Sequence, residues 1–142
     1  MTGRCRMLNM GVNWLAVLLA TVASMALGMV WYMGFAKAWI SATGKSEQEL
    51  MGEGKSPSPF VFAAIAQFVM AFFLANLVPG VWGSLSAYNG AMTGLFVWGG
   101  FVITAMIINH RYQSMSWKLT LIDGGYLLGV LMVQGVVIGL FG

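Results

Sequence analysis

Apolar residues gather in four runs of about twenty residues, separated by shorter polar stretches. The runs cover residues 12–33, 60–78, 90–109 and 119–141. At 1.5 Å per residue, a helix of this length crosses roughly 30 Å of hydrocarbon. Transmembrane β-strands instead alternate apolar and polar residues over about ten positions, and these runs do not. The pattern therefore predicts an all-α membrane protein whose residues 1–142 form a single four-transmembrane-helix bundle.

The polar loop 36–59 follows the first run. Its beginning combines Lys37 with the apolar or aromatic residues Phe35, Trp39 and Ile40. This mixture is typical of a short amphipathic helix whose rings lie at headgroup depth while the lysine reaches lipid phosphate. We expect such an interfacial helix at the start of the first loop.

The rest of that loop carries a helix signal and a breaking signal. Ser46 and Glu49 have the spacing of a capping box, so we expect a second short helix as far as about Met51. The segment 56–59 contains two prolines. Because a residue before proline disfavours helical geometry, we expect an extended entry into the second span.

Composition supports a membrane location. Apolar residues make up 59% of the chain and charged residues 8%, with a mean hydropathy of +0.82. Soluble domains carry about 25% charged residues, so the lipid bilayer is the first expected partner. The net charge of +3 comes from seven dispersed Lys and Arg residues. Without a basic cluster, the sequence predicts no nucleic-acid partner.

The basic residues favour one orientation of the bundle. Four alternating spans place loops one and three on one side and both termini on the other. Arg4 and Arg6 lie on the terminal side, whereas the loop side carries Lys37, Lys45, Lys55, Arg111 and Lys118. The positive-inside rule therefore predicts that both loops are cytoplasmic and both termini periplasmic.

Small and weakly polar residues form stripes on two spans. When the residues are projected at about 100° per residue, one face of the first span carries Asn13, Ala20, Thr21, Ser24 and Gly28. The third span carries a similar set, Asn89, Thr93, Gly100 and Thr104. Such stripes let helix backbones approach in lipid, so we expect them at helix contacts.

The fourth span has two distinct faces. Two G-x-x-x-G spacings, Gly125 with Gly129 and Gly135 with Gly139, share one stripe. Asp123 and Gln134 lie on the opposite face, about three turns apart. One face is suited to packing within the protein's own bundle, and the other is suited to contact with a partner. Self-association, docking to other membrane subunits and packing within the chain all remain open.

Asp123 is the only acidic residue within a predicted span, and intramembrane carboxylates usually have a partner or a task. Alternating spans bring it to the same membrane side as several polar residues. These are Tyr32, Lys37, Asn109, His110, Arg111 and Lys118. Two interpretations follow: a protonatable or ligand site, or a buried ion pair that fixes the third loop.

Residues for other chemistry are few. The chain has one Cys and one His, so it offers no metal site built from protein ligands alone. It has no nucleophile with a neighbouring base and no phosphate-binding loop, which predicts no catalytic residues and no enzymatic activity. No cofactor is predicted. A bound lipid, quinone or pigment stays open, through Trp98 in an apolar groove or His110 as an axial ligand.

Several short segments occur in the order found in a known family. They are Asn13-Trp14-Leu15-Ala16-Val17, Gly28 with Trp31-Tyr32, Lys37-Ala38-Trp39, Asn109-His110-Arg111 and Ile122-Asp123-Gly124-Gly125-Tyr126. The chain resembles the bacterial membrane family known as domain of unknown function 1761. The resemblance implies four transmembrane helices and a bacterial cytoplasmic (inner) membrane, and it implies no activity.

Two functional hypotheses emerge from the sequence. The first is a non-enzymatic bundle that acts through helix contacts, as a homo-oligomer or as an accessory subunit of a larger membrane complex, such as a bioenergetic one. The glycine stripe of the fourth span motivates it. The alternative is a small proton-coupled transporter or channel that uses Asp123, with Tyr126 and Gln134 along its path.

Overall fold

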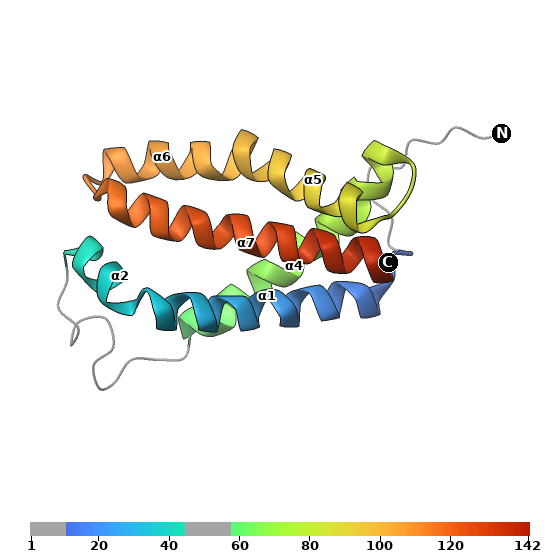
Figure 1. The fold of residues 1–142 in the computed structure, drawn as a ribbon, viewed down its shortest axis with the longest axis horizontal. Coiled ribbons are helices and arrows are strands. Elements are labelled where there is room, and N and C mark those ends of the chain that lie inside the picture. The colour runs from blue at the N-terminus through green and yellow to red at the C-terminus, as the bar shows by residue number, and fades with distance from the viewer. Residues whose placement is uncertain (1–10, 45–57) are drawn as a thin grey trace.

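The computed structural model describes residues 11–44 and 58–142, and every regular element among them is a helix. Four helical segments are long and apolar enough to cross a membrane, as predicted. They are α1 (Trp14–Gly34), α4 (Ser58–Trp82), the composite segment Ala87–Tyr112 and α7 (Trp117–Phe141). Figure 1 shows them running back and forth along one common direction. The predicted four-span, all-α architecture is therefore confirmed.

The third span is a composite of α5 (Ala87–Val97), a π-helical turn η1 (Trp98–Val102) and α6 (Ile103–Tyr112). A π turn contains more residues than an α turn, so it rotates the face that follows it. Thr93 is buried in α5, but Gly100 and Thr104 are exposed. The prediction that Thr93, Gly100 and Thr104 share one packing face is wrong. A projection that assumes 100° for every residue does not account for the larger number of residues in the π turn.

Helix caps fix where three of the spans begin. Asn13 accepts from the backbone amides of the first turn of α1, and Ser86 and Ser116 do the same for α5 and α7. Such caps satisfy amides that a helix start leaves unpaired. Asn13 also donates through Nδ2 to the carbonyl of Phe141, 2.8 Å away. This bond ties the beginning of α1 to the end of α7.

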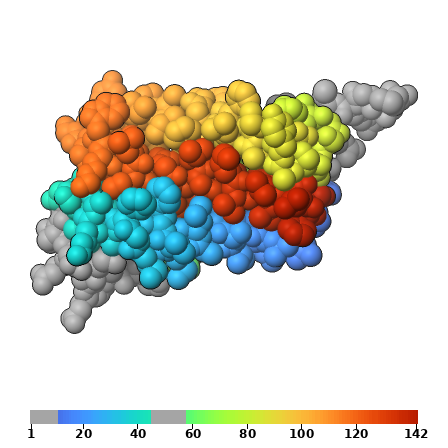
Figure 2. Space-filling model, viewed as in Figure 1, coloured from blue at the N-terminus to red at the C-terminus, as the bar shows by residue number. Residues whose placement is uncertain are grey.

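The fourth span, α7, is the central helix of the bundle. It packs against α1, α4, α5 and α6, and in Figure 2 it forms a band between α1 and the α5–α6 segment. The main apolar core lies where α7 meets α1 and α4. Its fully buried members are Val17, Ala20, Ala71, Leu74, Leu131 and Ile138. A helix covered on several sides needs close contacts on more than one face.

Glycines provide one of these contacts, between α5 and α7. A Cβ atom on Gly90 would overlap the backbone carbonyl of Gly135, and one on Gly139 would overlap that of Ser86. Gly94 faces the backbone of Leu131 in the same way. Only glycine lets the two backbones touch here. The spacing of glycines in the fourth span predicted a contact at Gly135 and Gly139, whereas the facing pair in α5, Gly90-x-x-x-Gly94, was not predicted.

The other two glycines of the stripe face a different helix. A Cβ on Gly125 would meet the Trp31 ring, and one on Gly129 would meet the Leu27 side chain, both from α1. The four glycines therefore contact α1 and α5 of the same chain. The stripe of small residues predicted on α1 also lies at helix contacts, since Ala20, Thr21, Ser24 and Gly28 are all buried.

The first loop begins with α2 (Ala36–Thr43), separated from α1 by Phe35 alone. This is the predicted short helix, and Lys37 is exposed on it. The helix predicted from Ser46 lies outside the described residues. Ser58 and Pro59 belong to α4, so the prediction of an extended entry is wrong for these two residues. Proline is tolerated in a first helical turn because its missing N–H would be unpaired there anyway.

The two ends of the bundle carry different turns between helices. The turn from α6 to α7 and helix α2 lie at one end, and the turn from α4 to α5 lies at the other with the C-terminus (Figure 1). This arrangement matches the predicted alternation. Which end faces the cytoplasm stays a prediction.

Cysteine labelling tests that orientation. In a Cys5→Ala background, Gln113→Cys marks the α6–α7 turn and Ser84→Cys marks the α4–α5 turn, and both positions are exposed. We expect a membrane-impermeant thiol reagent added outside intact cells to label Ser84→Cys and to spare Gln113→Cys until the cells are opened. The reverse pattern would show that the orientation inferred from the basic residues is wrong.

A single methyl group tests the contact between α5 and α7. Gly90→Ala forces Cβ into the Gly135 carbonyl, and overpacking of this kind costs about 1–3 kcal/mol. We expect a thermal unfolding midpoint several degrees below that of the wild type in detergent.

The matched control is Gly99→Ala, in the same span, where an added Cβ has nothing within 4 Å. It should leave the midpoint unchanged or raise it slightly, because alanine favours the helix. Equal midpoints for the two variants would contradict the close backbone approach.

Candidate functional site

Asp123 lies in the second turn of α7, partly buried and facing α1 and α2. Its Oδ1 accepts a hydrogen bond from the Tyr32 hydroxyl at 2.6 Å. Trp39 of α2 also hydrogen-bonds its side chain, and His110 of α6 is close enough to act on its charge. Among the described residues, the groups that act on Asp123 thus come from three other helices.

Tyr126 continues the site one turn further along α7. Its ring meets the Tyr32 ring edge to face, with centroids 5.0 Å apart. Its hydroxyl accepts a hydrogen bond from Gln67 Nε2 of α4 at 2.7 Å. Gly28 makes room for this ring, because a Cβ there would lie 2.8 Å from the hydroxyl. The contact between Gly28 and the Tyr126 ring therefore determines how closely α1 and α7 approach each other at this point.

Three buried side chains extend the polar cluster toward the middle of the bundle. The Ser24 hydroxyl lies 2.6 Å from Gln67 Oε1. Gln134 Nε2 donates to Ser24 Oγ at 3.1 Å and to the Gln67 carbonyl at 2.9 Å. These bonds join α1, α4 and α7, and amide and hydroxyl bonds of this kind hold helices together in lipid. Gln134 is fully buried, and its Oε1 has no partner among the described residues.

The cluster has a defined depth. Asp123 and Gln134 are eleven residues apart on α7, which corresponds to about 16 Å along the helix. Polar side chains therefore line about half of a hydrocarbon core roughly 30 Å thick. Beyond Gln134, toward the termini, the packing is apolar and includes the fully buried Val17, Val78 and Ile138. The bundle interior is polar in one half and mainly apolar in the other, where the buried Thr93 hydroxyl accepts a hydrogen bond from the Trp82 indole. A crevice of about 170 Å³ lies at the terminal end of that second half, lined in part by Asn13, Pro79 and Ile138.

The third loop has a separate set of contacts. The Arg111 guanidinium lies 3.8 Å from the centre of the Trp117 ring, and its NH2 group donates to Thr120 at 2.9 Å. His110 Nδ1 lies 2.7 Å from the same hydroxyl. The hydroxyl of Ser116, the cap of α7, donates to the carbonyl of Ala42. These contacts hold the α6–α7 turn against the start of α7 and the end of α2.

The residues predicted around Asp123 are only partly brought together. Tyr32 and His110 lie beside it, whereas Arg111 interacts with Thr120 and Trp117. Lys37 and Asn109 are exposed on α2 and α6. The interpretation of Asp123 as half of a buried ion pair therefore finds no cationic partner in hydrogen-bonding contact among the described residues.

Gln67 is the member of the cluster that sequence reasoning missed. It is one of two amide side chains in the second apolar run, where polar groups are costly and usually matter. That signal was present in the sequence. What the sequence could not show is that Gln67 lies at the level of Ser24 and Tyr126.

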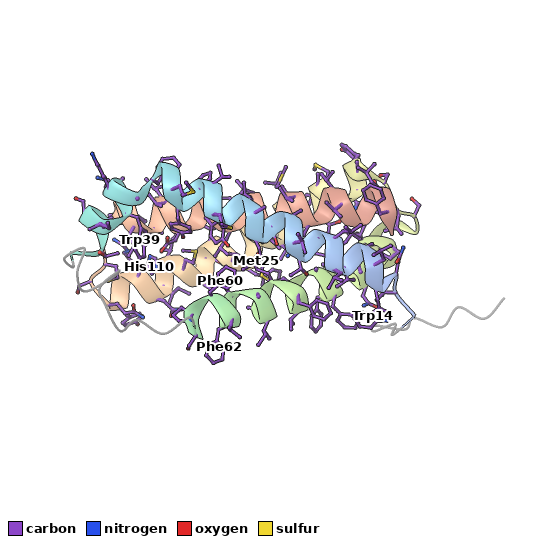
Figure 3. All side chains as sticks on the ribbon, turned by 90° about the horizontal axis from the view of Figure 1, so that it is seen from below. Trp14, Met25, Trp39, Phe60, Phe62 and His110 are labelled. Atoms are coloured by element: carbon purple, nitrogen blue, oxygen red, sulfur yellow. The ribbon has the colours of Figure 1, made fainter. Side chains whose placement is uncertain are left out.

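A groove of about 340 Å³ opens beside the two tyrosines, between α1 and the beginning of α4. Its lining consists of Met25, Gly28, Met29, Tyr32, Pro59, Phe60, Ala63 and Tyr126. Figure 3 shows Met25 and Phe60 on the sides where α1 and α4 approach each other, while Phe62 points outward. Aromatic and apolar side chains dominate the groove, as in most small-molecule sites.

The structure offers less support for the other sites considered, a metal site and a ligand site at Trp98. Within the described ranges, no three His, Cys, Asp or Glu side chains lie close enough together to hold a metal ion. The Trp98 indole donates to the Gly124 carbonyl at 2.8 Å and joins η1 to α7, and its side chain packs against the apolar core. The residue pattern of the third span did not predict this bond.

Comparison with known proteins places the chain in a family. A family model described as a protein of unknown function, DUF1761, matches residues 15–139, and the chain belongs to this family. No curated protein and no solved structure matches the chain. The family relationship agrees with the resemblance found in the sequence, and it assigns no activity.

Gln67→Leu tests whether the polar cluster holds the three helices together. The variant removes the partner of the Tyr126 hydroxyl and of Ser24. The loss of buried interhelical hydrogen bonds costs about 1–2 kcal/mol. We expect a lower thermal unfolding midpoint in detergent, and little change for Ile65→Ala, which removes a side chain that is 55% exposed on the same helix. A midpoint for Gln67→Leu as high as that of the wild type would contradict this role.

Proposed function

We propose that this member of the DUF1761 family is a non-enzymatic, proton-coupled transporter in which Asp123 binds and releases the proton. One observation carries the proposal. Polar side chains follow one another from Asp123, through the Tyr32–Tyr126 contact and Gln67, to Ser24 and Gln134. Intramembrane carboxylates near such chains are typical of proton pathways in pumps and transporters.

The chemistry of Asp123 supports this use. It is the only carboxylate in the described part of the chain, and its hydrogen-bonding partners there, Tyr32 and Trp39, are neutral. A carboxylate in a low-dielectric setting needs a proton or a cation as its counter-charge. Exchange of one for the other is the elementary step of proton coupling.

The apolar half of the bundle favours a carrier over an open channel. Val17, Val78 and Ile138 fill the interior beyond Gln134 with no exposed surface. A proton cannot cross such packing unless the helices move, and in the proposed cycle this movement exposes Asp123 to each side of the membrane in turn. Movement between two accessible states is the working cycle of a transporter.

Association with a second copy or with a larger membrane complex stays a separate hypothesis. Its motivating feature was the glycine stripe of α7. Because Gly125, Gly129, Gly135 and Gly139 pack on α1 and α5 of the same chain, a partner would have to use another surface. We therefore place the transporter hypothesis first.

Proton movement in vesicles tests the proposed function. Purified protein is reconstituted into liposomes that contain a trapped pH-sensitive dye, and a potassium diffusion potential drives proton entry. We expect acidification well above that of protein-free vesicles, and a rate roughly tenfold lower for Asp123→Asn, which corresponds to about 1.4 kcal/mol in the barrier.

Asp123→Glu is the matched control, because it keeps a group that can be protonated. It should retain more of the rate than Asp123→Asn, and both variants should elute at the wild-type volume in detergent. Equal rates for wild type and Asp123→Asn would exclude Asp123 as the proton site. A wild-type rate no higher than that of empty vesicles, both without and with an organic cation inside the vesicles for exchange, would overturn the proposal.

A further inference from the structure

The groove between α1 and α4 adjoins Tyr32, the hydrogen-bonding partner of Asp123. Tyr32 and Tyr126 form its inner wall, and the Tyr32 hydroxyl is the group that donates to Asp123 at 2.6 Å. Phe60, at the start of α4, is 58% exposed and borders the opening. A molecule dissolved in the bilayer can therefore enter sideways and reach within one tyrosine ring of the carboxylate.

The lining selects the charge of that molecule. Among the described residues, the lining carries three aromatic rings, from Tyr32, Phe60 and Tyr126, and no Lys, Arg or His. Ring faces attract positive charge, most strongly where water is excluded. The Asp123 carboxylate behind Tyr32 adds attraction for a cation and repulsion for an anion, and both act over a longer range in a low-dielectric medium.

The rest of the lining selects an apolar body. Met25 and Met29 provide flexible, polarizable side chains on the α1 wall, and such side chains adapt to irregular shapes. Gly28 and Ala63 keep the space between them open. The volume of about 340 Å³ lies at the lower end of the range for small-molecule sites, roughly 300–1,000 Å³.

We propose that this groove binds lipophilic organic cations from the bilayer, and that these are the substrates exchanged for the proton on Asp123. The proposal rests on the proposed function, since it supplies the substrate class for that transporter. A cation in the groove and a proton on the carboxylate neutralise the same charge. Binding of one therefore weakens binding of the other.

The competing occupants fit less well. An anionic lipid headgroup would meet a carboxylate and, in the part of the lining that the structure describes, no cationic side chain. A neutral amphiphile would gain apolar contact but would not sense the charge of Asp123. These two classes become outcomes of the test, because their binding does not depend on Asp123 in the same way.

Equilibrium binding of tetraphenylphosphonium to the purified full-length protein in neutral detergent tests the proposal. Groove-specific binding is defined as the part of the signal that is lost in the Ala63→Phe variant, because the phenylalanine side chain fills the groove. We expect Asp123→Asn to weaken binding by about tenfold. We also expect wild-type binding to weaken when the pH is lowered far enough to protonate Asp123, and binding to Asp123→Asn to keep only the pH dependence of His110, the titratable side chain of α6 that acts on this carboxylate.

Two controls test whether the cation binds in this groove and whether its charge is recognised there. Val69→Phe enlarges a side chain in a separate apolar crevice between α4 and the third span, so it should leave binding within about twofold of the wild type. Tetraphenylborate, the anion of the same shape, should show no component that Ala63→Phe abolishes. All variants should elute at the wild-type volume.

Each outcome decides between the two proposals. Groove-specific binding of tetraphenylborate equal to that of tetraphenylphosphonium, or unchanged cation binding in Asp123→Asn, would overturn the inference about the groove. Proton movement that depends on Asp123 would then still support the transporter. Cation binding that depends on Asp123 and competes with protons, in a protein that moves no protons in vesicles, would retain the site and reject transport.

Discussion

The contact between α5 and α7 is the constraint on which the rest of the structure depends. At Gly90 and Gly135 the two backbones touch, and no side chain fits between them. In lipid, where the hydrophobic effect does not drive helices together, such close packing replaces it. With one face of α7 fixed against α5 and another against α1 through Gly125 and Gly129, its polar residues turn toward α1, α2 and α4.

The polar cluster follows from that placement. In hydrocarbon every buried polar group needs a partner, and the partners of the α7 residues are on other helices: Tyr32 for Asp123, Gln67 for Tyr126 and Ser24 for Gln134. These bonds hold the bundle together, and they also bring a carboxylate close to a groove that opens to the bilayer. One set of interactions thus supports both the fold and the proposed exchange of a proton for a cation.

Much of the fold could be predicted, because span length and apolar composition are local properties. The four spans, the helix after the first span and the seam of Ala20, Ser24 and Gly28 were all anticipated. The face of the third span was not, since the π turn at Trp98–Val102 rotates Gly100 and Thr104 outward. A projection with one fixed angle per residue has no means to detect such a turn.

The sequence by itself determined that the chain has four segments long and apolar enough to cross a membrane, where these segments are, and that Asp123 is the one acid within them, because each of these follows from residue type and order. Only the tertiary structure decided that the glycines of α7 contact α1 and α5, that Gln67 completes the polar cluster, and that Lys37 and Asn109 are exposed. The reason is physical: these outcomes depend on how each helix is rotated about its axis relative to its neighbours, and that rotation is set by contacts between segments far apart in the chain.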